Sequence, residues 1–186
     1  MTRIIAGAAG GRRLTVPAGN GTRPTADRVR EGLFSSLLSQ RGTLAGDRVL
    51  DLYAGSGALG LEALSRGAAE TWLVDREPRA VAALRHNVAA VALPGGQVLA
   101  EPVERLLAQP PDTPFDVVFA DPPYALDVTP ALALLVSNGW LAPGGSIVVE
   151  RATRNGELTW PDGIEGVRNR RYGETTLWYG SRTSST

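Results

Sequence analysis

The sequence contains no cysteine, no lysine and a single histidine among its 186 residues. Without cysteine the chain can form neither a disulfide framework nor a thiolate metal site, and the reducing cytoplasm is the compartment that we expect. One histidine, His86, argues against a histidine-based metal cluster and against a Ser-His-Asp triad. We therefore expect no bound metal.

Long hydrophobic runs are also missing. The apolar stretch in the first residues, "MTRIIAGAAGG", is too short for a signal peptide, and no run reaches the length that spans a bilayer. The hydrophobic content of 43% is enough for a substantial core, and the length suits one domain or one domain with a short extension. We expect a monomer with no membrane partner.

The net charge is zero, but its distribution along the chain is uneven. Residues 1–41 contain seven arginines and two acidic residues, whereas the remainder contains 12 arginines and 17 acidic residues. A basic segment on a mildly acidic body suggests a polyanionic partner. The alternative is a solvated surface arm without a partner.

The order of apolar patterns predicts the fold. Residues 1–24 have two short apolar runs that suit a small hairpin or an extended arm, and residues 24–42 have the apolar stripe of a helix that stops at Gly42. Five short apolar strands then alternate with helical segments: strands at 48–53, 71–75, 97–100, 116–121 and 146–150, and helices at 58–66, 77–91, 102–108 and 129–138. This alternation predicts a parallel sheet covered on both faces.

The last part of the chain, "EGVRNRRYGETTLWYG", predicts an antiparallel hairpin that turns at Tyr172 and Gly173 and closes one sheet edge. We therefore expect an α/β fold, which the resemblance described below implies to be of the Rossmann-like class. Its seven-stranded sheet would be mostly parallel, with a C-terminal antiparallel hairpin and a short basic N-terminal extension. We divide the chain into a basic arm and helix at 1–41 and a single globular unit at 42–182.

A glycine-rich loop follows the first long strand. In "DLYAGSGALG" (51–60), Gly55, Gly57 and Gly60 fit the spacing G-x-G-x-x-G between a strand and a helix. Such glycines allow a tight turn and a close approach of the backbone to a ligand. Asp75 ends the next strand, where an acidic residue can accept hydrogen bonds from ribose hydroxyls. The pattern predicts a nucleoside-bearing cofactor at the carboxyl edge of the sheet.

The glycine spacing alone does not distinguish a nicotinamide dinucleotide from S-adenosylmethionine, and an ordinary strand–helix turn is the third possibility. Asp51 lies just before the loop, where its charge would repel a pyrophosphate but attract the sulfonium and ammonium groups of S-adenosylmethionine. Asp51 thus favours S-adenosylmethionine. We expect the cofactor to contact Asp51, Ala54, Gly55, Ser56, Gly57, Asp75, Arg76 and Glu101.

Glu101 is included because it follows the third long strand, where a carboxylate could accept from the adenine amino group. The alternative is a surface acid at the start of a helix, favoured by the helix dipole. Pro102 has no N–H, so a backbone donor to the adenine ring would come from elsewhere, such as Val103.

Two consecutive prolines end the strand at 116–121. In "FADPPYAL" (119–126), Asp121 precedes Pro122 and is therefore restricted to extended geometry. Pro122 and Pro123 have fixed φ, so the Pro122 carbonyl is held in one direction. The elbow therefore presents two acceptors, the Asp121 carboxylate and the Pro122 carbonyl.

Two fixed acceptors suit the exocyclic amine of a nucleobase. This amine is conjugated with its ring and is a poor nucleophile, and gripping both N–H bonds would turn its lone pair toward an incoming methyl group. Tyr124 offers a flat face on which an extruded base can stack. We expect direct attack on the sulfonium methyl, with Asp121 or water taking the amine proton. The predicted catalytic residues are Asp121, Pro122, Pro123 and Tyr124.

The glycine loop, Asp75 and "DPPY" together resemble the Rossmann-like methyltransferases that use S-adenosylmethionine to modify amino nitrogen. Three longer segments, "RIIAG…GRRL…P…TRPTADRVREGLF", "LDLYAGSGALGLEALSRGA" and "YGETTLWYG", resemble the RsmD family of bacterial 16S rRNA guanine-N2 methyltransferases. The resemblance covers nearly the whole chain. It implies that the substrate is a guanine of 16S rRNA within an assembling or assembled small subunit.

An RNA substrate requires phosphate-binding side chains, and arginine suits bidentate phosphate contact. We select the arginines of the basic arm: Arg12, Arg13, Arg23, Arg28 and Arg30. The alternative for Arg28 is an ion pair with Glu31 on the helix. A second, weaker group in the tail hairpin comprises Arg168, Arg170 and Arg171.

Other functions share parts of this pattern. An adenine-N6 methyltransferase of DNA or RNA could use the same elbow, although such DNA enzymes usually add a target-recognition domain for which this chain has no room. Protein-glutamine methyltransferases usually have Asn before the prolines. A nicotinamide enzyme and a non-catalytic RNA-binding module also remain open, and the module predicts that replacing Asp121 has no effect.

Overall fold

The computed structural model describes residues 2–18, 24–123 and 126–184, and in residues 24–26 it describes the backbone only. The chain begins with a small antiparallel hairpin of β1 (Thr2–Arg3) and β2 (Arg13–Leu14), followed by helix α1 (Pro24–Arg41). This confirms the hairpin that the first residues suggested. The helix ends where predicted, because Gly42 adopts a positive φ of 83° and its N–H donates to the Leu38 carbonyl over 2.7 Å.

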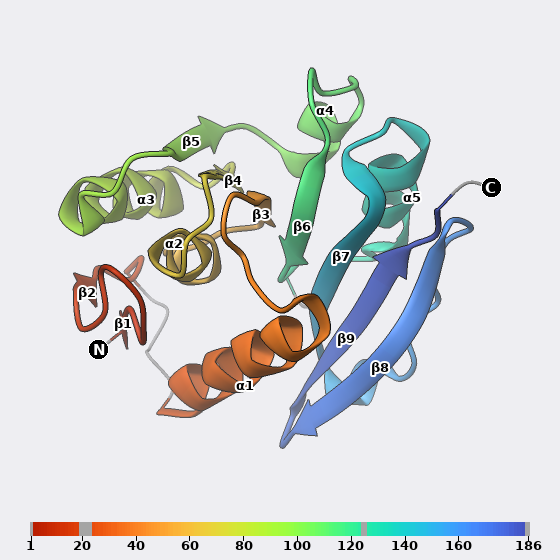
Figure 1. Cartoon of the computed structure of the whole chain (residues 1–186), viewed down its shortest axis with the longest axis horizontal. Coiled ribbons are helices and arrows are strands. Elements are labelled where there is room, and N and C mark those ends of the chain that lie inside the picture. The colour runs from red at the N-terminus through yellow and green to blue at the C-terminus, as the bar shows by residue number, and fades with distance from the viewer. Residues whose placement is uncertain (1, 19–23, 124–125, 185–186) are drawn as a thin grey trace.

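The main sheet has seven strands in the order β5-β4-β3-β6-β7-β9-β8 (Figure 1). Its strands are β3 (Arg48–Leu52), β4 (Glu70–Asp75), β5 (Gly96–Ala100), β6 (Phe115–Ala120), β7 (Leu141–Ala152), β8 (Ile164–Tyr172) and β9 (Thr175–Arg182). The first five are parallel, and β9 pairs antiparallel with both β7 and β8. The predicted fold class, including the C-terminal hairpin, is confirmed.

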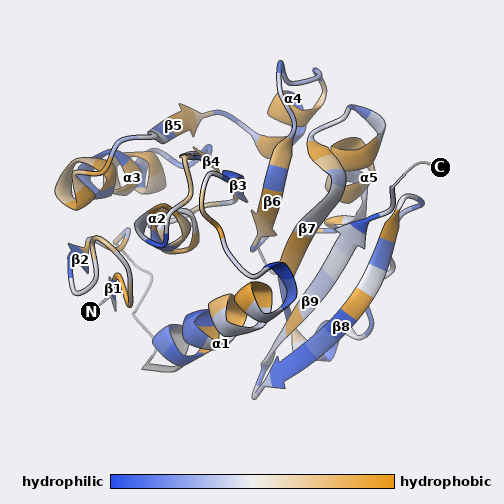
Figure 2. Ribbon diagram, in the orientation of Figure 1, coloured by the Kyte–Doolittle hydropathy of each residue, from blue (hydrophilic) through white to orange (hydrophobic). Residues whose placement is uncertain are grey.

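Helices cover both faces of this sheet. The connecting helices are α2 (Ala58–Ser65), α3 (Pro78–Val91), α4 (Val103–Leu107) and α5 (Thr129–Ser137). One buried cluster joins the sheet to α4 and α5, and two further clusters join its other face to α1, α2 and α3. The hydropathy colouring agrees, because β6 and α5 are largely apolar while the edge strand β8 is mainly polar (Figure 2). None of the described helices has the length and apolarity that crossing a bilayer requires.

Strand β7 is longer than the sequence indicated. We expected this strand over residues 146–150, but it begins at Leu141, and its register with β6 shifts after the pair Phe115–Leu141. Further along, Val117 to Ala120 pair regularly with Ser146 to Val149. The regular section places the carboxyl ends of β6 and β7 side by side.

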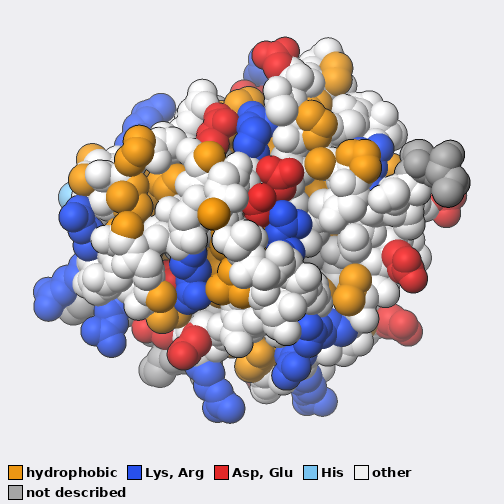
Figure 3. Space-filling view, in the orientation of Figure 1, with side chains coloured by type: hydrophobic (Ala, Val, Ile, Leu, Met, Phe, Trp, Pro, Cys, Tyr) orange, Lys and Arg blue, Asp and Glu red, His pale blue; other side chains and the backbone are white. Residues whose placement is uncertain are grey.

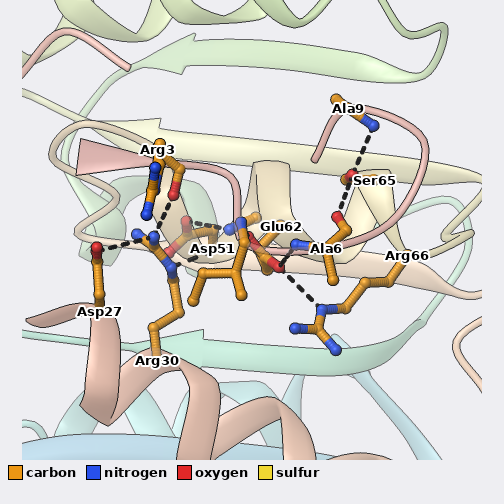
Figure 4. Close-up of polar contacts among 11 residues, drawn as sticks. Arg3, Ala6, Ala9, Asp27, Arg30, Asp51, Glu62, Ser65 and Arg66 are labelled. Atoms are coloured by element: carbon orange, nitrogen blue, oxygen red, sulfur yellow. Dashed lines mark hydrogen bonds and ion pairs between the residues drawn. The ribbon is translucent and has the colours of Figure 1, made fainter. Parts of the chain in front are cut away.

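The N-terminal hairpin is anchored to α2 by buried polar groups (Figure 4). Glu62 is fully buried, and its carboxylate accepts hydrogen bonds from the backbone N–H groups of Ile5 and Ala6 at 2.8 and 3.1 Å. The Ser65 hydroxyl donates to the Ala6 carbonyl and accepts from Ala9. A buried carboxylate requires such partners, so α2 fixes the position of the hairpin.

Candidate active site

A cleft of about 1390 Å³ opens at the carboxyl ends of the central strands. Its lining includes Gly55 of the glycine loop, Asp75 at the end of β4, and Asp121 with Pro122 and Pro123 after β6. These residues are far apart in sequence, but β3 lies between β4 and β6 in the sheet. The order of the parallel strands therefore brings the glycine loop and the proline elbow to one cavity.

The glycine loop has the backbone geometry that its sequence predicted. Gly55 and Gly57 have positive φ values of 60° and 81°, and a Cβ atom at Gly55 would meet no atom within 4 Å. Gly60 differs, because a Cβ there would lie 2.5 Å from Leu73 Cδ2. Gly55 thus leaves room for a ligand close to the backbone, whereas Gly60 allows helix α2 to pack tightly on the sheet.

Asp75 connects β4 to the glycine loop. Its Oδ2 accepts from the Gly55 N–H at 3.0 Å, and its Oδ1 accepts from the Glu77 N–H at 3.0 Å. A carboxylate has further lone pairs and can accept additional hydrogen bonds from ribose hydroxyls. Arg76 also lines the cleft, where it is exposed and lies 3.7 Å from a Glu77 carboxylate oxygen.

Asp51 lies behind the loop and does not line the cleft wall. It is 2% exposed, and its Oδ2 accepts from the Gly60 N–H at 2.9 Å. Burial raises its pKa to about 8, opposed by the Gly60 hydrogen bond and assisted by the charge of Asp75. Asp51 therefore holds the end of the glycine loop through Gly60, and its carboxyl group can titrate at that position.

Asn87 supports the same loop, a role that the sequence did not indicate. This residue of α3 is fully buried, and its Nδ2 donates to the Ser56 carbonyl at 2.7 Å and to the Thr15 carbonyl at 2.8 Å. Its Oδ1 accepts from the Thr15 N–H at 2.7 Å. No local motif could reveal this bridge, because it joins three segments that meet only in the folded chain.

Asp121 is accessible to solvent through the cleft, yet it lies among many protein atoms. Burial is the main cause that raises its pKa well above the ordinary value, and the negative charges of Glu150 and Asp51 add to it. The Leu126 N–H donates to the Pro123 carbonyl at 3.0 Å. Tyr124, the predicted stacking residue, lies outside the described residues.

Two residues that line the cleft were not among those predicted from the sequence. Tyr53 has a positive φ of 56°, which is uncommon for a bulky side chain, and its hydroxyl donates to Glu104 Oε1 at 3.1 Å. Glu150 lines the cleft at the end of β7. Its position as the acidic last residue of the strand predicted at 146–150 was the available signal for Glu150. The predicted residues Ala54, Ser56, Gly57 and Glu101 are not part of the cleft lining, although the first three form the loop that shapes it.

The arginines of the basic arm occupy different environments. Arg13 and Arg28 are exposed, and Arg23 lies outside the described residues. Arg12 is exposed as well, but its Nη1 donates to the carbonyls of Ala90 and Val91, both at 2.9 Å, at the end of α3. It therefore also stabilises the helix terminus.

Arg30 requires a correction. It is 4% exposed, its guanidinium forms an ion pair with Asp27 at 3.2 Å, and it also donates to the Arg3 carbonyl. Buried Glu62 lies 3.9 Å away, and burial lowers the pKa of Arg30 (Figure 4). A phosphate cannot reach this guanidinium in the folded chain, so we remove Arg30 from the proposed RNA contacts.

Comparisons with known proteins agree with this geometry. The family described as conserved hypothetical protein 95 matches residues 2–181. The ribosomal RNA small subunit methyltransferase D of Escherichia coli K12 is 42% identical over 160 residues, which is 86% of this chain and 79% of the relative. The protein of the same name from Haemophilus influenzae is 40% identical over 152 residues, covering 80% and 77% of the two chains.

Among solved structures, "Putative methyltransferase yhhF" from Escherichia coli superimposes with a TM-score of 0.87 and 38% identity, covering 99% of both chains. The similarity thus extends over the hairpin, α1, the sheet and the cleft. The chain belongs to the family of the ribosomal RNA small subunit methyltransferases D, the RsmD family that the sequence motifs resemble.

Proposed function

We propose that this protein transfers a methyl group from S-adenosylmethionine to the exocyclic N2 amine of a specific guanine in the 16S rRNA of the small ribosomal subunit. The observation that carries the proposal is the single cleft that joins the glycine loop to the Asp121 elbow. The name of the related methyltransferases supports a ribosomal RNA substrate. We place this reaction in the cytoplasm, where ribosomal subunits assemble.

The cleft provides groups that fit the cofactor. Gly55 leaves space at its Cα, and the Asp75 carboxylate lies at the cleft wall with capacity for ribose hydroxyls. Asp51 lies behind the loop with a pKa of about 8, and cationic groups of a bound cofactor nearby would favour its ionised form. S-adenosylmethionine supplies an electrophilic methyl group on a sulfonium, so the protein has to bring a nucleophilic nitrogen in line with it.

The elbow would orient that nitrogen. The Asp121 carboxylate accepts one N–H of the guanine amine and the Pro122 carbonyl accepts the other, which turns the nitrogen lone pair toward the methyl group. When the N–C bond forms and the S–C bond breaks, the sulfonium becomes a neutral thioether and the amine carries an extra proton. Asp121, whose pKa is raised by burial and by Glu150, accepts that proton directly or through water.

Exposed arginines offer a path for the RNA to the cleft. Arg28 on α1 and Arg170 on β8 are exposed, and Arg171 on β8 lines the cleft itself. Arginine side chains gather along the lower edge of the molecule, over α1 and β8 (Figure 3). With Arg12, Arg13 and Arg23 of the hairpin segment, we propose that they contact phosphates.

Methyl mapping tests the proposal. The protein is incubated with labelled cofactor and small ribosomal subunits from a strain that lacks the gene, and the modified nucleotide is identified by nuclease digestion and mass spectrometry. We expect one N2-methylguanine in 16S rRNA, and none with the Asp121→Ala variant. An N6-methyladenine product, or label incorporation that survives Asp121→Ala, would contradict the proposal.

A further inference from the structure

Two carboxylates lie side by side where the target base would bind. In the regular section of the sheet Ala120 of β6 pairs with Val149 of β7, so the next residues along the two parallel strands are Asp121 and Glu150. Neighbouring strands are about 4.8 Å apart. Both residues line the cleft, and their charges influence one another. Asp121 already has a role toward the amine, and Glu150 does not.

Strand alternation places the two carboxylates on one face of the sheet. Ala120 and Val149 belong to the core shared with α4 and α5, whereas Phe119 and Val148 belong to the cluster under α1. The residues after Ala120 and Val149 therefore point toward the α1 side. A planar base whose amine is held by Asp121 would present the adjacent edge of its ring to Glu150.

The neighbouring ring position differs between the purines. In guanine the amine-bearing carbon is flanked by N1–H, a donor, and by N3, an acceptor. In adenine the amine is flanked on the ring by N1, an acceptor without hydrogen, and in 2-aminopurine N1 is an acceptor in the same way. A carboxylate accepts hydrogen bonds and donates none when ionised. It would pair with the N1–H of guanine and repel the N1 lone pair of the other two bases.

We propose that Glu150 selects guanine by accepting a hydrogen bond from its N1–H while Asp121 holds the amine. The inference rests on the proposed function and adds the residue that determines which base is accepted. A site that hydrogen-bonds a substrate donor rejects analogues without that donor, because here the half-buried Glu150 carboxylate would face the N1 lone pair of the analogue and two acceptors repel one another. Other carboxylates of the lining, such as Glu157 and Glu174, lie in exposed segments beyond the strand ends and lack this position beside Asp121.

The test compares two bases at the mapped target position. Small subunits are reconstituted with ligated 16S rRNA that carries either guanine or 2-aminopurine there, since 2-aminopurine keeps the amine but lacks N1–H. For the wild-type protein we expect kcat/KM for guanine to exceed that for 2-aminopurine by at least about 100-fold. Glu150→Gln should reduce this ratio at least about tenfold, because the amide can donate to the unprotonated N1.

Controls separate this role from others. Glu174→Gln removes a different cleft carboxylate and should leave the ratio at the wild-type value, and Glu150→Asp should retain the guanine preference at a lower rate. Cofactor affinity by calorimetry should be the same for all variants. A Glu150→Gln ratio equal to that of the wild type would overturn the inference while leaving the proposed function intact. No transfer to guanine by the wild type would overturn the proposed function itself.

A Glu150→Gln variant inactive on both bases is followed by Glu150→Ala, which removes the acceptor without adding a donor. A ratio of kcat/KM for guanine to kcat/KM for 2-aminopurine that is lower in Glu150→Ala than in the wild type then supports the inference. Loss of transfer to both bases in both variants, with unchanged melting and cofactor binding, would assign Glu150 to the transfer step and refute its role in base selection.

Discussion

The buried carboxyl group of Asp51 makes the stability of this protein depend on pH in a calculable way. Its pKa in the folded chain is about 8, against 3.8 for an exposed aspartate, because burial disfavours the ionised form. Between these two values the folded state holds a proton that the unfolded state has released. The contribution of Asp51 is therefore fully present below about pH 4 and is lost as the pH rises toward 8.

Replacing Asp51 with Asn removes this titration and keeps an acceptor for the Gly60 N–H, which now lies 2.9 Å from Asp51 Oδ2. For one proton and the two pKa values above, the free energy of unfolding should fall by about 2.5 kcal/mol between pH 5 and pH 7. In the Asp51→Asn variant this part of the decrease in the free energy of unfolding is absent. It should therefore gain about 2.5 kcal/mol relative to the wild type over that interval.

Urea denaturation at pH 5, 6 and 7, without cofactor, measures the difference. Asp121 also has a raised pKa and contributes to the slope of both proteins, and because the charge of Asp51 adds to that shift, the comparison with the wild type measures Asp51 together with its coupling to Asp121. Glu165→Gln, which removes an exposed carboxylate on β8, controls for the loss of one negative charge. If the wild type and Asp51→Asn lose the same free energy between pH 5 and pH 7, Asp51 is not protonated in the folded state and the argument fails.

Three further predictions concern the reaction. Asp121→Ala should lower kcat at least about 100-fold and leave cofactor affinity within about threefold, since the lost interaction acts in the transition state. Wild-type kcat should fall as the pH decreases through the raised pKa of Asp121, and a kcat that stays constant over the whole pH range in which the protein is folded would contradict this. Asp75→Ala should weaken cofactor binding, measured by calorimetry, at least about tenfold, because it removes the acceptor of the Gly55 N–H. An unchanged cofactor affinity would refute the role of Asp75 in cofactor binding. Arg13→Glu should weaken RNA binding and flatten its salt dependence, as measured by filter binding. The control Arg105→Glu on α4 should leave both the RNA affinity and its salt dependence unchanged. Equal effects of the two substitutions would exclude a specific contact at Arg13.

The strands and helices were predictable because their signals are local. Buried parallel strands leave continuous apolar runs, and three of them end at or directly before an acidic residue: β4 at Asp75, β5 before Glu101 and β6 before Asp121. The same locality explains why Gly55, Asp75 and Asp121 could be assigned to one site. Each follows a strand, and parallel strands align their carboxyl ends.

Other features depend on contacts between distant segments and left no pattern in the sequence. Arg30 lies two residues from exposed Arg28 in the same basic segment, and its burial depends on groups from distant parts of the chain, the Arg3 carbonyl and the buried carboxylate of Glu62, as well as on Asp27. Asn87 belongs to a helix without any chemical motif, yet it bonds to Ser56 and Thr15. Such buried polar pairings are fixed by tertiary structure. A count of charges along the sequence therefore assigns some buried residues, such as Arg30, to a surface role.

These pairings change how residues 1–41 relate to the reaction. Their charge suggested an arm that only captures RNA, but Ile4 and Leu14 are buried beside α2 and α3, and Thr15 is bonded to the side chain that holds Ser56. The glycine loop is thus supported by Asp51 through Gly60 and by Asn87 through Ser56. A segment that carries the exposed residue Arg13 and also braces the cofactor loop would couple RNA binding to cofactor binding. Asn87→Ala, which cuts that link, should reduce any effect of cofactor on RNA affinity, and an undiminished effect would show that the two sites are independent.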